Sequence, residues 1–299
     1  MRQDARDRAA VDQLRPGLVR VLAPNPSPMT HHGTNTYVLG GQSLCIIDPG
    51  PDDAAHLARL LQVIAGRPVS HIIVTHSHLD HSALAPALTR ATGAPVLAFG
   101  SRLAGRSARM QALVLQDPAQ GGEGVDGDFT PDQTLPDGAT VAGDTWFLRA
   151  IHTPGHFGNH ICLRWDDAIF SGDHVMGWAS SLVSPPDGDL SDYIAACHRL
   201  RAEAATILYP GHGGPVTDPA ARIDWLIAHR KAREAQMLAA LDSGPQTIAT
   251  LTATLYTDTP TALHPAAARN VWAHLIDLFG RDLIDSSPDL RPEAWFYKR

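Results

Sequence analysis

Four short segments of the chain carry histidine and aspartate side chains in spacings that suit metal binding. The first, THSHLDH at Thr75–His81, follows the apolar run HIIV, which predicts a strand. Residues two apart on an extended chain point the same way, so His76 and His78 can bind one metal ion together. Asp80 and His81 fall where a helix is expected to begin, and the turn there directs them toward a second metal ion. Imidazole nitrogens combined with a carboxylate are typical ligands of Zn²⁺.

Three further segments each place one candidate ligand in a turn directly after a predicted strand. His156 lies in TPGH, Asp173 in SGDH and His212 in PGHG. Loops held on a rigid sheet are a common place for functional residues. We expect His156 to complete the ligands of the first metal ion and His212 those of the second. The Asp173 carboxylate can bridge the two ions.

The first two-thirds of the chain alternates short β-branched runs with helical patterns, as a scaffold for these turns requires. Strands are expected at Leu18–Ala23, Thr36–Leu39, Leu44–Asp48, His71–Thr75, Pro95–Ala98, Thr145–Ile151, His160–Trp165, Ala168–Ser171 and Ile207–Tyr209. Helices are expected near Asp52–Ala65, Ser82–Thr92, Leu190–Ala204 and Pro219–Leu241. This alternation predicts an α/β domain. The Gly- and Asp-rich stretch between Ser101 and Gly143 predicts a mobile loop followed by hairpin turns.

A turn at Asp242–Pro245 predicts a boundary between a catalytic domain, residues 1–242, and a small C-terminal domain, residues 243–299. The order of elements expected in the small domain, three helical segments and then a hairpin, is that of a winged helix. The segments are Thr247–Ala253, Leu255–Tyr256, Pro265–Phe279, Leu283–Ile284 and Trp295–Tyr297. Acidic residues outnumber basic ones there, so binding to duplex DNA is not expected. We expect this tail to pack on the catalytic domain or on a partner subunit, with a homodimer as one arrangement.

Composition narrows the class of protein. With 299 residues, 44% hydrophobic and 18% charged, the chain reads as globular rather than disordered. Its net charge of −7 provides no basic field for non-specific binding of nucleic acid. No apolar run is long enough for a membrane span, and the polar N-terminal residues do not resemble a signal peptide. Three cysteines without a paired spacing indicate reduced thiols, which fits a cytoplasmic protein that does not bind membranes.

The series THSHLDH, TPGH, SGDH and PGHG resembles the metallo-β-lactamase superfamily. That resemblance implies a four-layered αβ/βα sandwich with its metal ions at one edge of the sheets. The segments GTNTY at Gly33–Tyr37, IIDPG at Ile46–Gly50 and AIFSGDHVMG at Ala168–Gly177 are similar to the β-lactamase-like protein 2 subgroup, which also ends in a winged-helix-like domain. By resemblance, one metal ion would be held by His76, His78 and His156, the other by Asp80, His81 and His212, with Asp173 between them.

These ligands predict a hydrolase with two Zn²⁺ per chain, with iron or manganese as alternative metals. A hydroxide that bridges the metals would attack an ester or a phosphodiester bond. The substrate would be a small molecule or a short single-stranded RNA, since an animal mitochondrial member of the subgroup is an endoribonuclease. Asp80 is the candidate catalytic residue, because its carboxylate can orient the hydroxide and accept a proton.

Three residues near the motifs have less specific roles. Asp48 follows a predicted strand and could accept the free N–H of a liganding histidine or cap the helix near Asp52. Both alternatives stay open at this stage. His174 and Trp178 follow the aspartate motif and are expected to line the pocket, where His174 could also donate to substrate.

Other functional classes share some of these residues or differ at a particular one of them. A glyoxalase-II-like thioesterase matches every metal position, but its usual C-terminal domain is helical and basic, unlike the acidic tail here. A weak, promiscuous β-lactamase is a further alternative, although true metallo-β-lactamases generally lack an aspartate of the Asp173 kind. Flavodiiron proteins carry a glutamate where His78 stands. A non-enzymatic partner-binding module would need a closed structural metal site, whereas seven ligands for two ions leave coordination positions open.

Overall fold

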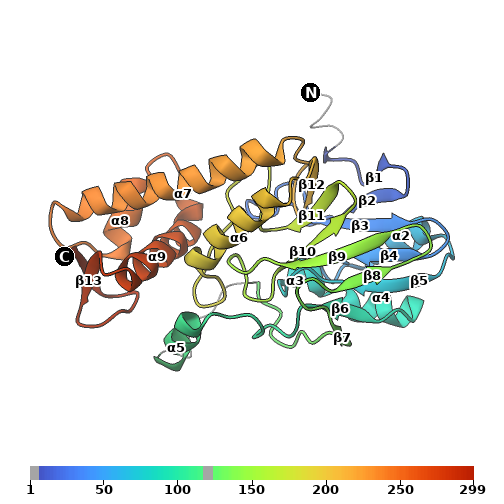
Figure 1. The fold of residues 1–299 in the computed structure, drawn as a ribbon, viewed down its shortest axis with the longest axis horizontal. Helices are drawn as coiled ribbons and strands as arrows, with labels where there is room; N and C mark the ends of the chain where they lie inside the picture. The colour runs from blue at the N-terminus through green and yellow to red at the C-terminus, as the bar shows by residue number, and fades with distance from the viewer. Residues whose placement is uncertain (1–6, 117–123) are drawn as a thin grey trace.

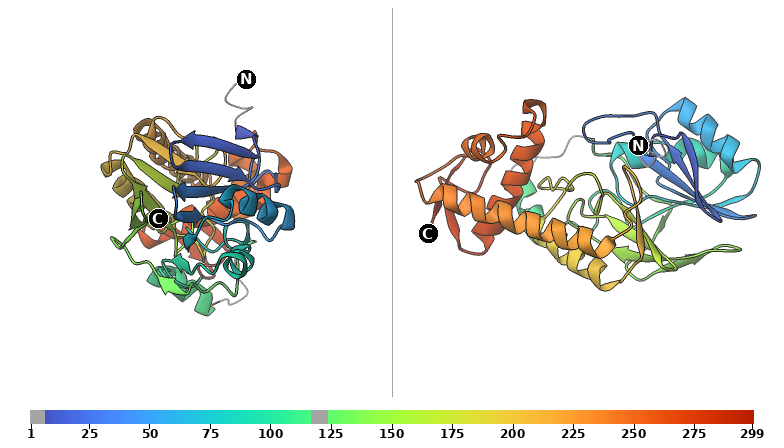
Figure 2. Two further views of the ribbon diagram at one scale, coloured as in Figure 1. Left: turned by 90° about the vertical axis from the view of Figure 1, so that its right-hand side faces the viewer. Right: turned by 90° about the horizontal axis from the view of Figure 1, so that it is seen from above.

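Two β-sheets packed face to face, with helices on both outer faces, position the candidate ligands (Figure 1, Figure 2). The computed structural model describes residues 7–116 and 124–299. The first sheet runs in the order β1 Val11–Arg15, β2 Leu18–Leu22, β3 Asn35–Gly40, β4 Leu44–Ile47, β5 Val69–Ile73, β6 Val96–Ala98 and β7 Gln133–Thr134. The second runs β12 Ile207–Pro210, β11 Ala168–Gly172, β10 Ile161–Trp165, β9 Phe147–His152 and β8 Thr140–Ala142.

Alternation along the central strands divides their side chains between two cores. On β3, Tyr37 and Leu39 enter the core between the sheets, while Val38 faces the helices on the outer side. On β11, Phe170 enters the core between the sheets, and Ile169 faces the helices on the other outer side. Strands buried on both faces read as continuous apolar runs, which is why the sequence predicts them readily.

The helices complete a four-layered arrangement. The helices before the C-terminal part are α2 Ala54–Ile64, α3 Leu79–Ser82, α4 Ala85–Thr92, α5 Ala108–Gln116, α6 Leu190–Ala202 and α7 Pro219–Leu241. Helices α2 and α4 pack on the first sheet, and α6 and α7 pack on the second. Aspartates cap several N-termini; Asp53, for example, accepts from the His56 N–H at 2.7 Å at the start of α2. The predicted layers are therefore confirmed.

The C-terminal part has the winged-helix order of elements: α8 Ile248–Leu255, the 3₁₀ turn η1 Thr261–Leu263, α9 His264–Gly280, β13 Ile284–Ser287 and β14 Trp295–Lys298. Figure 2 shows the long α7, in orange, running from the catalytic sheets into this part. Met237 and Leu241, near the end of α7, belong to the same apolar core as Val271 of α9 and Phe296 of β14. The boundary after Asp242 stays a prediction.

The structure corrects three local expectations. Residues 108–116 of the expected mobile loop form α5, because Met110 and Leu113 pack into the C-terminal core. Residues 117–123 of that stretch lie outside the described residues, and β8 and β9 form an antiparallel hairpin as expected. Strand β1 was missed because its exposed edge position allows a polar sequence. The separate helix expected at Leu255–Tyr256 is wrong, since Leu255 is the last residue of α8 and Tyr256 its C-cap.

None of the helices in the described ranges is long and apolar enough to span a membrane.

Candidate metal centre

The seven candidate ligands come together where strands of both sheets end. His76 and His78 follow β5, Asp80 and His81 lie in the short helix α3, and the other three follow β9, β11 and β12. Three overlapping groups have ligand atoms within 4.8 Å of one another. They are His76–His78–His156, His76–His81–Asp173 and Asp80–His81–His212. The structure thus brings together the two sets of residues that the sequence motifs suggested. The group of His76, His81 and Asp173 overlaps with both sets.

Ring nitrogens converge in the first group without enough hydrogens to join them. His78 Nδ1 lies 2.8 Å from His76 Nε2 and 3.1 Å from His156 Nε2. The Nδ1 atom of His156 donates to the Leu182 carbonyl at 2.6 Å, so its Nε2 carries a lone pair in the neutral ring. Thr75 Oγ1 donates to Asp48 and therefore accepts from His76 Nδ1 at 3.0 Å, which leaves a lone pair on His76 Nε2 as well. A cation among these three nitrogens would satisfy all of them.

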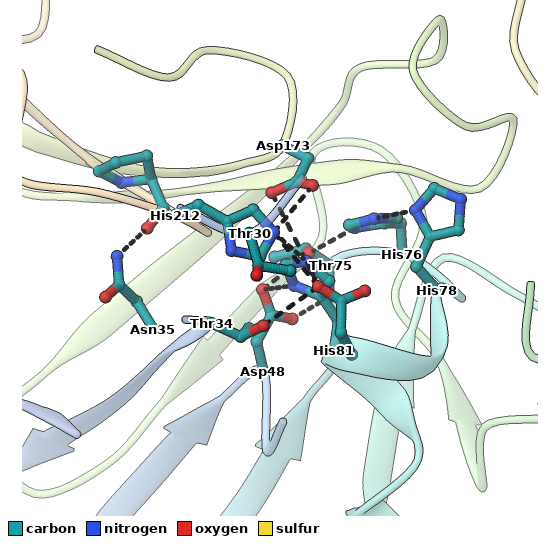
Figure 3. Close-up of polar contacts among 12 residues, drawn as sticks. Thr30, Thr34, Asn35, Asp48, Thr75, His76, His78, His81, Asp173 and His212 are labelled. Atoms are coloured by element: carbon teal, nitrogen blue, oxygen red, sulfur yellow. Dashed lines mark hydrogen bonds and ion pairs between the residues drawn. The ribbon is translucent and has the colours of Figure 1, made fainter. Parts of the chain in front are cut away.

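The second group brings two imidazoles against two carboxylates. His212 Nε2 lies 3.2 Å from Asp80 Oδ2 and 3.2 Å from Asp173 Oδ2. His81 Nε2 lies 3.5 Å from Asp173 Oδ1, and it lies 3.3 Å from His212 Nε2. Asp173 Oδ1 is buried and has no hydrogen-bond partner among the described residues. This group requires positive charge, whether protons or a metal ion supply it (Figure 3).

The histidines of the two groups differ in the direction in which their pKa values are shifted. Burial lowers the pKa of His76, of His156 and of His78, the last to about 3, so these rings are neutral at pH 7. Burial also opposes protonation of His81 and His212, but the neighbouring carboxylates outweigh it. They raise the pKa of His81 well above its usual value and that of His212 to about 10. The metal-ligating side chains present are five imidazoles and two carboxylates, a set that fits two divalent cations.

The Asp48 carboxylate supports the second group from beneath. Its Oδ2 atom accepts from His81 Nδ1 at 2.9 Å and from Thr75 Oγ1 at 2.9 Å, contacts that Figure 3 shows. Its Oδ1 atom accepts from the Thr75 N–H at 2.8 Å. The N-cap of α2 is Asp53. Of the two roles left open for Asp48, the structure therefore favours orientation of a candidate ligand.

Four supporting groups were not assigned a role from the sequence. Thr34 Oγ1 donates to Asp80 Oδ2 at 3.1 Å, and the Gly33 carbonyl accepts from His212 Nδ1 at 3.2 Å. Both residues belong to the GTNTY segment, and the resemblance of that segment to a subgroup could have pointed to a role at the site. The hydroxyl of Thr75 contacts His76, and the carbonyl of Leu182 contacts His156. A backbone carbonyl leaves no mark in the residue type, so Leu182 could not have been found.

Two glycines of the motifs occupy positions where a larger residue would clash with its neighbours. A Cβ on Gly211, directly before His212, would lie 2.3 Å from Asp173 Oδ1. A Cβ on Gly155 would lie 2.3 Å from the Tyr193 Cα, and Gly155 has a φ of 138°. These turns therefore need glycine for the close approach of the ligand-bearing segments.

His174 and Trp178 have different surroundings. The His174 side chain is fully buried, with its Nε2 atom 3.6 Å from Cys197 Sγ and its ring against Tyr193. Because both ring nitrogens are shielded from solvent, the structure gives no support to His174 as a donor to substrate. Trp178 is half-buried and stacks on His31 with ring centroids 4.7 Å apart. A Cβ on Gly213 would lie 2.7 Å from its ring, so Trp178 lies beside the His212 turn.

Comparison with protein families matches two segments. Residues 29–212 match the metallo-beta-lactamase superfamily, and residues 247–295 match the beta-lactamase associated winged helix domain. Full-length relatives include beta-lactamase-like protein 2 homologs. The one from Drosophila melanogaster is 29% identical over 97% of both chains, and the one from Caenorhabditis elegans is 30% identical over 95% of this chain and 91% of its own.

Two further relatives extend the comparison. An atrochrysone carboxyl ACP thioesterase of Aspergillus fumigatus is 32% identical over 79% of this chain and 69% of its own. A solved structure, a metallo-beta-lactamase family protein from Thermus thermophilus, superposes with a TM-score of 0.76 at 26% identity, over 96% of this chain and 100% of the other. With the predicted motifs, layers and tail all present, the chain belongs to the metallo-β-lactamase superfamily of enzymes, in the group that carries a β-lactamase-associated winged helix.

Proposed function

We propose that this chain is a hydrolase that works with two divalent metal ions, zinc in the first place and iron or manganese as alternatives. The carrying observation is the convergence of ligand atoms: three neutral imidazoles face one another without enough hydrogens to join them, and beside them two imidazoles face two carboxylates that require positive charge. His76, His78 and His156 would hold one ion. Asp80, His81 and His212 would hold the other, and Asp173 lies between the two sets.

The bound ions would supply Lewis acidity and a water of lowered pKa. The residues of the chain then orient the reacting groups and move the proton. Asp80 is 27% exposed in its side chain, against 10% for Asp173, so it is the more open of the two carboxylates. Its Oδ2 atom accepts from Thr34 and contacts His212, and we assign Oδ1 as the oxygen that accepts the proton.

The bond cleaved is an ester or a phosphodiester, with a small molecule or a short single-stranded RNA as substrate. A thioester is the second candidate, and the similarity to fungal ACP thioesterases supports it. That similarity covers 79% of this chain, and all seven candidate ligands lie in the stretch that matches the superfamily, residues 29–212. The acidic tail gives no support to duplex DNA as a substrate.

Metal content and substrate class can be tested on the same preparations. Protein purified without chelator and then saturated should approach two metal equivalents per chain by elemental analysis. Asp173→Ala should lower both occupancies, because Asp173 contacts both groups. The loaded enzyme is then assayed on esters, thioesters, phosphodiesters, short RNAs and β-lactams. Folded protein that binds no more than one equivalent at saturation would rule out the two-metal proposal, and turnover of one panel member identifies the bond.

A further inference from the structure

Helix α9 of the C-terminal part and helix α7, which leads into that part, contact the same irregular segment that contacts candidate ligand His156. We propose that Asn270 of α9 and Arg230 of α7 are positioning residues for His156, acting through the backbone carbonyl of Leu182. The winged-helix part would then take part in building the metal centre in addition to packing on the catalytic domain. This inference rests on the proposed metal-dependent function.

The segment that links β11 to α6, residues 173–189, has no regular structure, although much of it is buried. The side chains of Ser181 and Val183 are fully inaccessible, and Ser184 is 8% exposed. Buried backbone groups outside helices and strands need partners from elsewhere in the chain. The conformation of this segment therefore depends on the groups that surround it.

Residues on both sides of Leu182 are held by α7 and α9. Asn270 Oδ1 accepts from the Val183 N–H at 3.1 Å, and Arg230 Nη2 donates to the Ser181 carbonyl. Arg230 Nη1 also donates to Asn270 Oδ1 at 3.0 Å, which fixes the amide with its oxygen toward the segment. The Asn270 amide thus holds the Leu182–Val183 peptide unit, to which the Leu182 carbonyl belongs, and the Arg230 guanidinium holds the peptide unit before it.

The Leu182 carbonyl accepts from His156 Nδ1 at 2.6 Å. This contact selects the tautomer with hydrogen on Nδ1 and directs the free Nε2 atom toward the other ligands. That Nε2 atom lies 3.1 Å from His78 Nδ1 and 3.8 Å from Asp173 Oδ2. A change in the path of residues 181–183 would therefore rotate the imidazole or release its tautomer.

The burial of Arg230 is consistent with a positioning role. Its side chain is 3% exposed, and it forms no ion pair with a carboxylate among the residues that the structure describes. Taking an unpaired guanidinium out of water is unfavourable, so its presence here adds little to stability. What it provides is a rigid planar fork that holds the Ser181 carbonyl and the Asn270 amide at the same time.

The test compares three variants in the full chain. Asn270→Ala removes the acceptor, and Asn270→Asp keeps an oxygen in the same place. Asp277→Ala is the matched control, because Asp277 joins α9 to α6 through Ser191 Oγ at 2.5 Å and pairs with Arg281, away from residues 181–184. Zinc affinity is measured by chelator competition in two backgrounds, His212→Ala, which retains the His76–His78–His156 group, and His78→Ala, which impairs it.

We expect Asn270→Ala to weaken zinc binding about 10- to 100-fold in the His212→Ala background, the range typical of groups that orient a ligand, and to have little effect in the His78→Ala background. Asn270→Asp should restore the affinity. Asp277→Ala should lower the melting temperature without changing either affinity. Equal losses in both backgrounds, or equal losses for Asn270→Ala and Asp277→Ala, would overturn the proposal.

A second readout does not require metal. Ring ¹⁵N chemical shifts of His156 in metal-free protein should report hydrogen on Nδ1 in the parent chain and in Asn270→Asp. Asn270→Ala should show averaging between tautomers. An unchanged tautomer in Asn270→Ala contradicts the inference even if zinc binds. Protein that binds no zinc but shows the expected tautomer shift contradicts the proposed function alone, so the two failures are distinguishable.

Discussion

At the scale of single residues, four candidate histidine ligands have one ring nitrogen held by a group outside the ligand set. The partners are Thr75 for His76, Asp48 for His81, Leu182 for His156 and Gly33 for His212. Such contacts fix the ring orientation before any metal ion binds and lower the entropy that binding must remove. The protein therefore presents its nitrogens already directed toward the candidate metal positions.

Replacement of Asp80 by Asn tests its assigned role in proton transfer. The amide keeps the shape and an oxygen but loses the charge and the proton acceptor. We expect kcat to fall about 10²-fold or more, the scale of a lost general base. The measurement is kcat on the substrate found by the panel, with metal content assayed on the same samples, and added zinc should not restore the rate.

The neighbouring variant His81→Ala provides the contrast. It removes a candidate ligand, so it should first lower the occupancy of the second metal, and excess zinc should recover part of the activity. If Asp80→Asn with two metal ions bound keeps near-full turnover, the proton acceptor is another group.

The variant Asp48→Ala tests whether the Asp48 carboxylate orients candidate ligand His81. The change leaves His81 Nδ1 and the Thr75 hydroxyl without their shared acceptor. We expect metal affinity to fall about 10- to 100-fold. Chelator competition measures the affinity, and Asp48→Asn separates charge from geometry because it keeps the side-chain shape. Unchanged affinity in Asp48→Ala would mean that Asp48 serves only the turn after β4.

At the scale of elements, α9 carries an unusual buried group. His274 is 1% exposed, and neither ring nitrogen has a hydrogen-bond partner among the described residues. Burial, aided by the positive charge of Arg230, lowers the pKa of His274 from 6.5 to about 3. The unfolded chain therefore binds a proton at this residue between those values, while the folded chain does not. His274 accordingly makes folding less favourable as the pH falls below 6.5.

His274→Leu should remove both the unpaired polar group and this acid sensitivity. We expect the free energy of unfolding at pH 7 to rise by about 1–3 kcal/mol, the cost of an unsatisfied buried group. The gain over the parent chain should grow between pH 6.5 and pH 4. Denaturant unfolding at several pH values measures both effects, and His198→Leu, at an exposed position of α6, is the control. A gain that does not change with pH would contradict the neutral, buried state of His274.

At the scale of the whole molecule, the two parts of the chain share a core. Met110 and Leu113 of α5, and Met237 and Leu241 of α7, are buried together with residues of α9 and β14. Both α5 and α7 lie before the predicted boundary. The C-terminal part therefore covers apolar surface of the preceding region, and its helix α9 also contacts the segment beside His156.

Removal of residues after Ser243 should expose these four side chains. We expect aggregation, or loss of a dimer if the parent chain forms one, since exposed apolar patches of this kind associate. Light scattering and sedimentation compare the truncated and full chains at equal concentration. A truncated protein that stays dispersed, with its oligomeric state and metal content unchanged, would show that the tail is an independent module.

The sequence by itself determined features that depend on neighbours along the chain. Short, continuous apolar runs predicted the central strands, and histidines two apart after β5 predicted a shared metal position, because both patterns follow from local backbone geometry. The order of the motifs also indicated the superfamily, and the expected order of helices and hairpin indicated the winged-helix tail; the comparisons confirm both. Asp48 could be named from the sequence, but its role could not be decided there.

Only the tertiary structure decided what holds those groups in place. The sequence could not show that α5 is a helix, because its apolar residues pack against segments that lie far along the chain. The Leu182 carbonyl accepts from a histidine 26 residues away, and Asn270 contacts a residue 87 positions away. The backbone groups in these contacts are present in every residue, so the residue type at Leu182 or Val183 does not mark them. Their pairing is set by how the sheets and the C-terminal helices pack, which no local pattern encodes.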